Sequence, residues 1–245
     1  MANKFPFILL VYLFCRLQES VGLTVASRSA YMAARETLID QKTTCAFVRS
    51  ELSSLLQEEW QSCTDIDLRR RVDIRDMAIF TDISGMIAPH GLRNHEVANA
   101  LSCLAQGYAK VCGAGEVSIR IVCKENYTAA CPKFHVDKIR VRALVTILGP
   151  GTEILGSEGQ LTQVEPLEVV FLKGTKWNKA KTPSKYFSLP AWMVSRSPEP
   201  AADSDTACRH RSPTGPPQRR VLVTLDECTD EREPEWVVGR HLPDS

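Results

Sequence analysis

One stretch, residues 131–153, constrains the fold more than any other part of the chain. It contains His135 and Asp137, then an apolar run of strand length, and after that the turn Gly-Pro-Gly at 149–151. Successive side chains of a strand point to opposite faces, so residues two positions apart share a face. On a strand, His135 and Asp137 would lie about 6–7 Å apart, which lets an imidazole and a carboxylate reach one metal ion.

Four runs in the second half of the chain have the pattern of β-strands. Residues 116–124 alternate apolar and polar side chains over a full strand length. The others are 141–148, 167–173 and 219–226. These runs predict a metal-binding β domain over residues 116–228, interrupted by an irregular insertion at 178–207 that is rich in Pro, Ser, Lys and Ala.

Residues 31–115 instead have the spacing of helices. From about Ala30 to Ser62, apolar residues recur every three or four positions. Asn94 is a suitable N-cap for a helix that runs to about Cys112. We therefore predict a helical portion over residues 31–115.

A run dense in both signs of charge interrupts this helical portion between Asp65 and Asp76. Such a run is typical of a solvated surface segment with salt bridges, and we predict that role for it.

The two ends of the chain are predicted to lie outside the folded domain. Residues 1–30 have the features of a signal or targeting leader, with one basic residue before an apolar run that is too short to span a bilayer. A hydrophobic helix that packs on the domain is the alternative. A leader implies a secretory or organelle location, and its absence implies the cytoplasm. The tail, 229–245, is predicted to be disordered.

The charge balance and the cysteines exclude some classes of protein. Lys and Arg number 30 and Asp and Glu 29, so the chain lacks the broad basic field of non-specific nucleic-acid binding. Nine cysteines without a Cys-x-x-Cys pair argue against a zinc ribbon and a fully paired disulfide framework. We expect a small-molecule substrate, no nucleic acid and no stable membrane span, whereas the sequence does not determine the oligomeric state.

His210 is the candidate for a third metal ligand, because it lies downstream of the pair within the β region. Two histidines and one carboxylate form the facial triad of non-haem Fe(II) oxygenases, which leaves positions open for substrate and O₂. The alternatives are a structural His135–Asp137 pair without metal, and a surface position for His210.

Arg220 and Arg219 are the candidates for binding a co-substrate. They begin the last predicted strand, about ten residues after His210. In 2-oxoglutarate-dependent oxygenases a basic residue at such a position binds the carboxylate of the co-substrate, which suits the two-pronged guanidinium.

Two further residues near the pair have two interpretations each. Cys131, four positions before His135, either binds zinc or is a buried thiol. Glu153 either orients a ligand histidine or ends the turn that precedes it.

A set of sequence blocks in the second half resembles the uncharacterised, mostly bacterial family known as domain of unknown function 1826. The blocks are Cys-Pro-Lys-Phe-His-Val-Asp at 131–137, Gly-Pro-Gly-Thr-Glu at 149–153, Phe-Leu-Lys-Gly-x-x-Trp at 171–177, His-Arg-Ser-Pro at 210–213 and Arg-Arg-Val-Leu-Val-Thr-Leu-Asp at 219–226. The chain departs from the family at Ile154, where Trp is usual, and in the longer spacing between Trp177 and His210. The family has no established activity, and the resemblance implies zinc as an alternative metal.

These observations predict an α+β fold. Its N-terminal helical portion would pack on a C-terminal antiparallel β-sandwich or jelly roll, like the double-stranded β-helix of cupins and Fe(II) oxygenases. The first functional hypothesis is an Fe(II)/2-oxoglutarate oxygenase that uses His135, Asp137 and His210. The alternatives are a non-catalytic Zn(II)-binding protein of metal homeostasis and an interaction module with a degenerate site.

Overall fold

The computed structural model describes residues 26–228 except 51, 53, 64, 76–78, 93, 126–130, 157 and 178–205. The predicted tail, nearly all of the predicted leader and nearly all of the predicted insertion therefore lie outside the described residues. In the described part of the chain, no helix combines the length and the apolar character needed to cross a membrane.

The elements alternate between helices and strands in the first half and are strands from residue 116 onward. The helices are α2 (Arg28–Ile39), α3 (Ser54–Gln61), α4 (Ile79–Ile87), the 3-10 helix η1 (Ala88–His90) and α5 (His95–Cys112). The strands are β1 (Cys45–Val48), β2 (Ile66–Asp73), β3 (Glu116–Lys124), β4 (Val141–Leu148), β5 (Glu153–Leu155), β6 (Leu161–Gln163), β7 (Val169–Lys173), β8 (Arg209–Arg211) and β9 (Arg220–Glu227).

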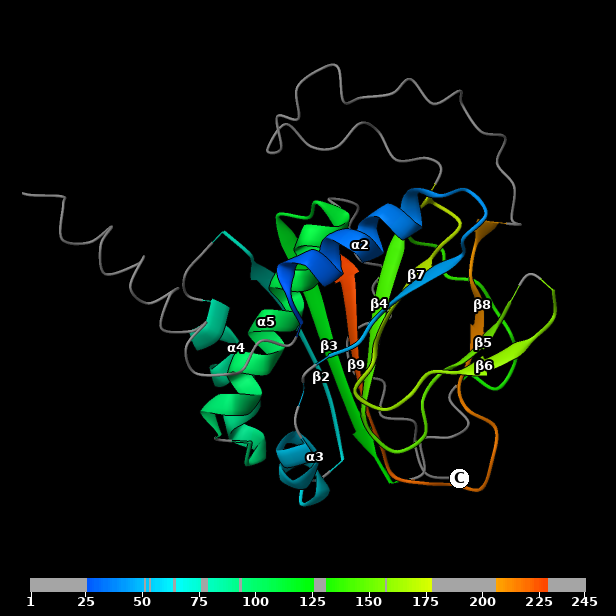
Figure 1. Ribbon diagram of the computed structural model, residues 1–245. Helices are drawn as coiled ribbons and strands as arrows, with labels where there is room; N and C mark the ends of the chain where they lie inside the picture. The colour runs from blue at the N-terminus through cyan, green and yellow to red at the C-terminus, as the bar shows by residue number, and fades with distance from the viewer. Residues whose placement is uncertain are drawn as a thin grey trace, which may run out of the picture.

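The strands form two antiparallel sheets. The large sheet has six strands in the order β1-β7-β4-β9-β3-β2, and the small sheet has three in the order β6-β5-β8. Figure 1 shows the helices α2, α4 and α5 on one side of the large sheet and the small sheet on the other. The chain therefore has the mixed helix and antiparallel-sheet composition that the sequence predicted.

The helix-covered face of the large sheet forms the main apolar core. The long helix α5 starts at Asn94, whose side chain accepts a hydrogen bond from the Glu96 amide at 2.8 Å, and ends at Gly113, which has a left-handed φ of 70°. Buried residues on its inward side pack against odd-numbered residues of β3 and β9, among them Ile119, Ile121 and Val223. The apolar side of the helix thus packs on the apolar face of the sheet, as the helix and strand spacings of the sequence predict.

The opposite face of the large sheet is the one that faces the small sheet. Even-numbered residues of β4 and β7, such as Leu144, Val170 and Leu172, form a second, smaller apolar cluster with Ile154 and other residues of the small-sheet side. The remaining even-numbered positions on this side of β4 and β9 are mostly polar or charged, as at Arg142, Thr146, Arg220 and Thr224.

The turn at 149–151 lies so close to neighbouring backbone that its two glycines have no room for a side chain. Gly149 has a φ of 84°, and a Cβ there would lie 2.3 Å from the Arg219 carbonyl oxygen. A Cβ on Gly151 would lie 1.7 Å from the Val164 carbonyl oxygen. Only glycine fits both positions, so the turn can bring the chain from the large sheet to the small one.

The first half of the chain is not purely the helical portion that the sequence predicted, because it also contributes the two edge strands of the large sheet. β1 pairs with β7, and β2 pairs with β3 along its whole length. These two strands have their hydrogen-bonding partners far along the sequence, so the local helical spacing does not determine their conformation.

The charged run from Asp65 to Asp76 has the predicted salt bridges, but it is also a strand, which the sequence did not predict. Asp67 pairs with Arg120 at 2.6 Å. Residues 66–73 form β2, whose apolar residues Ile66 and Val72 are buried. Charged side chains on an edge strand discourage pairing with another chain, which accounts for their density here.

Candidate metal centre

His135, Asp137 and His210 come together in space although the second and the third are 73 positions apart in the sequence. Their nearest ligand atoms all lie within 4.8 Å of one another, and the two imidazole centroids are 4.4 Å apart. Two backbone hydrogen bonds hold the histidines side by side, each amide donating to the other residue's carbonyl at 3.0 Å. The backbone thus positions both imidazoles before any ligand is bound.

Both imidazoles are oriented in the same way. His135 Nδ1 lies 3.1 Å from the Lys133 carbonyl oxygen, and His210 Nδ1 lies 3.2 Å from the Cys208 carbonyl oxygen. A carbonyl only accepts, so each Nδ1 carries the proton and each Nε2 keeps its lone pair. This is the tautomer that a metal-ligating histidine requires.

Asp137 presents one carboxylate oxygen to a protein partner and the other to the histidines. Its Oδ1 accepts a hydrogen bond from Arg142 Nη1 at 2.8 Å. Its Oδ2 is buried without a hydrogen-bond partner and lies 3.4 Å from His210 Nε2. Because that nitrogen carries no proton in the tautomer described above, the contact is between two acceptors, and a cation between them would satisfy both.

Arg142 connects Asp137 to a second carboxylate on the large sheet. The guanidinium donates through Nε and Nη2 to the two oxygens of Asp226, both at 2.8 Å, while Nη1 binds Asp137. Arg142 on β4 and Asp226 on β9 are direct cross-strand partners. A bidentate pair of this kind is rigid, so it fixes the side chain of Asp137 relative to the sheet.

The donor set fits a divalent metal of the iron and zinc type. Metal–nitrogen and metal–oxygen bonds of about 2.0–2.2 Å place neighbouring ligand atoms roughly 3 Å apart, close to the observed 3.4 Å between His210 Nε2 and Asp137 Oδ2. Burial lowers the pKa of His210, although the charge of Asp137 acts in the opposite direction. A neutral imidazole is the form that binds metal.

A cavity of about 120 Å³ opens beside the three residues. It is lined by Arg69, Arg120, Cys131, His135, Arg142, Leu144, Thr152, His210, Arg211, Ser212, Arg220, Leu222 and Thr224. The buried guanidinium of Arg220 is 1% exposed and donates to the hydroxyls of Thr152 at 2.9 Å and Thr146 at 3.3 Å. Arg220 therefore shares the cavity with both histidines.

Arg219 points away from this cavity, so it does not share the position of Arg220. Its guanidinium donates to the carbonyl oxygens of Trp60 and Cys63 and forms an ion pair with Glu125. Trp60 lies in α3 and Cys63 follows that helix. Adjacent residues of a strand point to opposite faces, which is why only one of the two arginines reaches the cavity.

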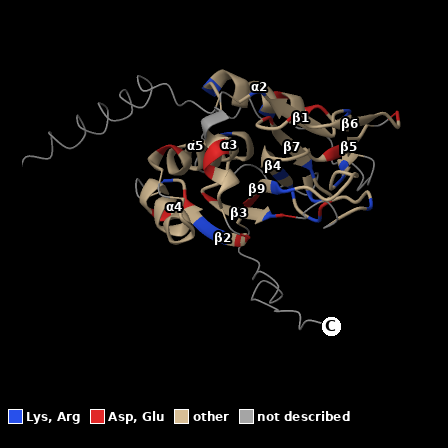
Figure 2. Cartoon of the chain, turned by 90° about the horizontal axis from the view of Figure 1, so that it is seen from below, with Lys and Arg blue, Asp and Glu red and all other residues tan. Residues whose placement is uncertain are grey.

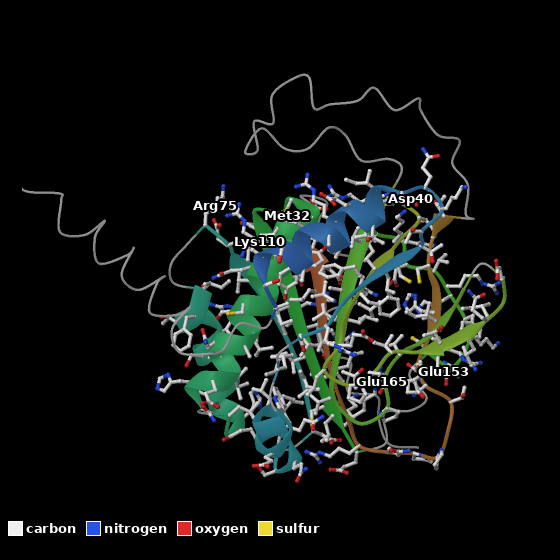
Figure 3. All side chains as sticks on the ribbon, in the orientation of Figure 1. Met32, Asp40, Arg75, Lys110, Glu153 and Glu165 are labelled. Carbon is white, nitrogen blue, oxygen red and sulfur yellow. The ribbon has the colours of Figure 1, made fainter. Side chains whose placement is uncertain are left out.

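Glu153 and Cys131, the two further candidates near the pair, do not lie where they would bind the metal together with the other three residues. Glu153 accepts hydrogen bonds from Arg211 Nε at 2.6 Å and from the Thr214 amide and hydroxyl at 2.8 and 2.9 Å, so it holds the chain after His210 rather than a histidine ring. Figure 3 labels Glu153 on the small sheet. Cys131 is exposed and lines the cavity, but it does not belong to the three-residue group.

Arg142 and Asp226 have a role in the site, as the partners that hold Asp137, that the sequence did not predict. Their signal was present, since both are charged residues in strands whose neighbouring positions are buried and apolar, such as Val141, Ala143 and Leu225. A charge in such a position is unusual unless it has a partner. The pairing itself follows from the register of β4 on β9, which the sequence alone does not provide.

The comparisons with known proteins identify a family without a described activity. A family model with the description "Protein of unknown function (DUF1826)" matches residues 29–226. The match extends beyond the second half, where the resembling blocks lie, to the start of α2. Among curated proteins, none matches the sequence.

Several solved structures resemble the chain at low identity. A dioxygenase for auxin oxidation from rice has 14% identity and a TM-score of 0.44, with 83% of this chain and 80% of that chain covered. The dioxygenase for auxin oxidation 1 from Arabidopsis thaliana, solved with 2-oxoglutarate, has 12% identity and a TM-score of 0.44, with 80% and 86% covered. A bsmA homolog from Methylobium petroleophilum has 13% identity and a TM-score of 0.41, with 80% and 92% covered. At these scores the likenesses assign no activity to this chain.

Proposed function

The chain belongs to the DUF1826 family of proteins of unknown function, and we propose that it is an Fe(II)- and 2-oxoglutarate-dependent oxygenase. The observation that carries the proposal is the buried Asp137 Oδ2, which lacks a hydrogen-bond partner and lies within 4.8 Å of a ligand nitrogen of each imidazole. Two histidines and one carboxylate, without a cysteine, are the ligand set of the non-haem Fe(II) oxygenases.

The path of the chain between the sheets supports a jelly-roll fold for this site. From β3 onward the chain alternates: β3 is in the large sheet, the His135 bridge is beside the small sheet, β4 is in the large sheet, β5 and β6 in the small one, then β7, β8 and β9 alternate again. Such alternation between two antiparallel sheets is the topology of a jelly roll. It explains why residues at 135 and 210 become neighbours.

Each residue of the site has a defined task in this proposal. His135, Asp137 and His210 would hold Fe(II), which supplies O₂ activation coupled to the oxidation of 2-oxoglutarate. Arg220 would bind a carboxylate of 2-oxoglutarate through its two-pronged guanidinium, and Thr152 would fix the guanidinium's orientation.

Arg142 and Asp226 have a positioning task. They would keep Asp137 from rotating, so that one oxygen always faces the metal. Neither residue would need to touch the metal or the co-substrate.

Metal content and 2-oxoglutarate consumption test the proposal. We expect the full chain, purified without a metal-binding tag and loaded anaerobically, to hold one Fe(II) and to convert 2-oxoglutarate slowly to succinate without a substrate. Asp137→Ala should lose both properties. Asp82→Ala removes a carboxylate that pairs with Arg70 at 3.3 Å on the helix side, and serves as the matched control. Unchanged iron content in Asp137→Ala, or stoichiometric zinc with no consumption of 2-oxoglutarate, would contradict the proposal.

A further inference from the structure

Two free cysteines from distant parts of the chain meet at the end of β7. Cys45 is the first residue of β1, and Cys208 directly precedes β8. Lys173, the last residue of β7, connects their backbones: its amide donates to the Thr44 carbonyl at 2.9 Å, and its carbonyl accepts from the Cys208 amide at 2.8 Å. The amide and carbonyl of one strand residue point to the same edge, so the two cysteines lie beside each other. Figure 2 shows β1 next to β7, at the opposite end of the large sheet from β2.

The two thiols also share one environment. Cys208 is 0% exposed and belongs to the smaller apolar cluster with Val170 and Leu172, and the partly exposed Cys45 packs against the same cluster. The Cys208 thiol hydrogen-bonds to the Cys45 sulfur, and the Thr44 side chain contacts both. The side chains, and not only the backbones, are therefore in contact.

The surroundings of Cys45 favour its thiolate form. The hydrogen bond from Cys208 lowers the pKa of Cys45; burial acts in the opposite direction, and Thr44 and the charge of Lys173 lower it further. Lys173 is itself buried, and its Nζ donates to the Asp40 carbonyl at 2.6 Å. A partly exposed thiol that is close to a cation and next to a second thiol is the usual arrangement of an oxidation-sensitive cysteine.

A second cysteine pair in the chain has the opposite properties. Cys63 and Cys123 also interact through their thiols, but both side chains are buried. Burial raises the pKa of both, that of Cys123 to about 11, although the nearby Arg219 acts in the opposite direction. A buried thiol of raised pKa is unreactive, so this pair is an internal control for the first.

From this arrangement we propose that Cys45 and Cys208 form a peroxide-reactive site, and that the disulfide formed there weakens metal binding through His210. The Cys45 sulfur attacks one oxygen of hydrogen peroxide, so that an S–O bond forms, the O–O bond breaks and one water leaves. The Cys208 sulfur then attacks the Cys45 sulfur, so that an S–S bond forms, the S–O bond breaks and the second water leaves with the Cys208 proton. The two thiols lose two electrons, which the peroxide takes up. Cys45 reacts first because solvent reaches it, whereas Cys208 is fully buried.

The connection to the metal site is the backbone of Cys208. Its carbonyl oxygen lies 3.2 Å from His210 Nδ1 and fixes the orientation of that imidazole. Sulfur atoms in a disulfide are only about 2.0 Å apart, closer than hydrogen-bonded thiols, and β1 pairs with β7 along its whole length, so Cys208 has to move toward β1. A displaced carbonyl orients the imidazole less well, and the loss of such a partner typically costs 10–100-fold in metal affinity. This step rests on the proposed metal site, whereas disulfide formation does not.

Peptide mapping by mass spectrometry after peroxide treatment of the full, metal-free chain tests the first step. We expect a linkage between Cys45 and Cys208, while Cys63 and Cys123 stay thiols. Cys208→Ser should leave Cys45 as a sulfenic acid that dimedone traps, and Cys45→Ser should leave Cys208 unmodified. Cys63→Ser is the matched control and should keep the linkage. No linkage in the natural chain, or a linkage of Cys45 to the exposed Cys131 instead, would overturn the proposal.

Calorimetry with Mn(II) tests the second step, after the peroxide has been removed. Oxidation should weaken Mn(II) binding by about tenfold, and dithiothreitol should restore it. Cys45→Ser, which changes a residue outside the metal site, should bind Mn(II) like the reduced natural chain and should not respond to peroxide. Equal Mn(II) affinity in the reduced and the disulfide form would overturn the proposal. A reduced chain that forms the disulfide but binds no Mn(II) would instead contradict the proposed function and leave the peroxide-reactive pair.

Discussion

The two faces of the six-stranded sheet are built from the same strands but carry different kinds of residues. The face toward the helices is apolar, and Tyr108 and Phe171 stack there with ring centroids 6.3 Å apart. The face toward the small sheet carries arginines, threonines and Asp226 beside the candidate ligands. Burial of apolar surface stabilises the fold at the first face, and the second face keeps charges that the fold alone would not select.

Two adjacent arginines, one directly before β9 and one at its start, show the same contrast at the level of single residues. Arg219 donates to backbone carbonyls in and after α3, and Arg220 is buried in the cavity. The contacts of the first arginine are therefore to the helical side of the fold, whereas those of the second, to Thr152 and Thr146, lie inside the cavity. Substitutions on either face should separate stability from ligand binding.

The largest effect on stability is expected at the helix face. Phe171→Ala removes a fully buried ring that contacts both Tyr108 and Tyr31, and should lower the free energy of unfolding by about 3–5 kcal/mol. Urea denaturation of the full chain measures this. A loss below about 1 kcal/mol would show that the helix face is not the main core.

A comparison of Arg220→Gln with Arg219→Gln tests whether the two faces have separate roles. Arg220→Gln should weaken 2-oxoglutarate binding by about a hundredfold, because a charge-assisted bidentate contact is lost in a buried site. Arg219→Gln should cost about 1–3 kcal/mol of stability and leave 2-oxoglutarate binding unchanged, because its contacts are to carbonyls and Glu125. Calorimetry measures 2-oxoglutarate binding and urea denaturation measures stability in both variants. Weaker 2-oxoglutarate binding in Arg219→Gln, with unchanged binding in Arg220→Gln, would contradict the separate roles of the two faces.

Arg142→Lys tests whether the guanidinium of Arg142 is needed to hold Asp137 in position for the metal. Lysine keeps the charge but cannot contact Asp137 and both oxygens of Asp226 at once. We expect the affinity for Mn(II) to fall by about tenfold, within the range found for residues that orient metal ligands. Arg140→Lys is the matched control, because Arg140 is two residues earlier and pairs with Glu227. Equal losses in both variants would argue against a specific role of Arg142.

Glu153→Gln is expected to have the smallest effect, and one that depends on pH. Burial by itself would raise the pKa of Glu153, but hydrogen bonds from Thr214 and Arg211 bring it below the ordinary value. Its stabilising contribution is then complete above the unfolded pKa of about 4.3 and is lost as the pH falls through the lower, folded pKa. At pH 7 the variant should be less stable by about 1–2 kcal/mol, and the difference from the natural chain should shrink in acid. A stability difference between Glu153→Gln and the natural chain that is the same at acidic and neutral pH would contradict the lowered pKa of Glu153.

The sequence predicted the strands and helices whose apolar residues follow one clear period. It missed the strands β1 and β2, whose residues also fit a helix or a solvated surface segment. The strands at 116–124 and 141–148 have the predicted bounds, and α5 begins after the predicted cap Asn94. β1 has four residues, which are too few to show a period inside a helical pattern. β2 was missed because its charged residues suggested a segment surrounded by solvent. Its apolar residues Ile66, Leu68 and Val72 are, however, an even number of positions apart, so on a strand they lie on the same face.

The candidate site could be predicted only as a set of residue types. Spacing brought His135 and Asp137 together, but their meeting with His210 depends on a single bridge between distant segments, which no local pattern encodes. The shared strand expected for the pair was wrong in detail, since His135 forms an isolated bridge with His210 and β4 begins only at Val141. The arginine behind Asp137 follows from strand register, which a single sequence does not provide.

X-ray absorption by iron in the Fe(II)-loaded full chain tests the central claim most directly. We expect scattering from two imidazoles, with the remaining nearest neighbours being oxygen atoms at about 2.0–2.2 Å and no sulfur. The His210→Ala variant should lose one imidazole contribution or the iron itself. A spectrum without histidine scattering, or one with sulfur from a cysteine such as Cys131, would contradict the assignment of His135, Asp137 and His210 as the metal ligands.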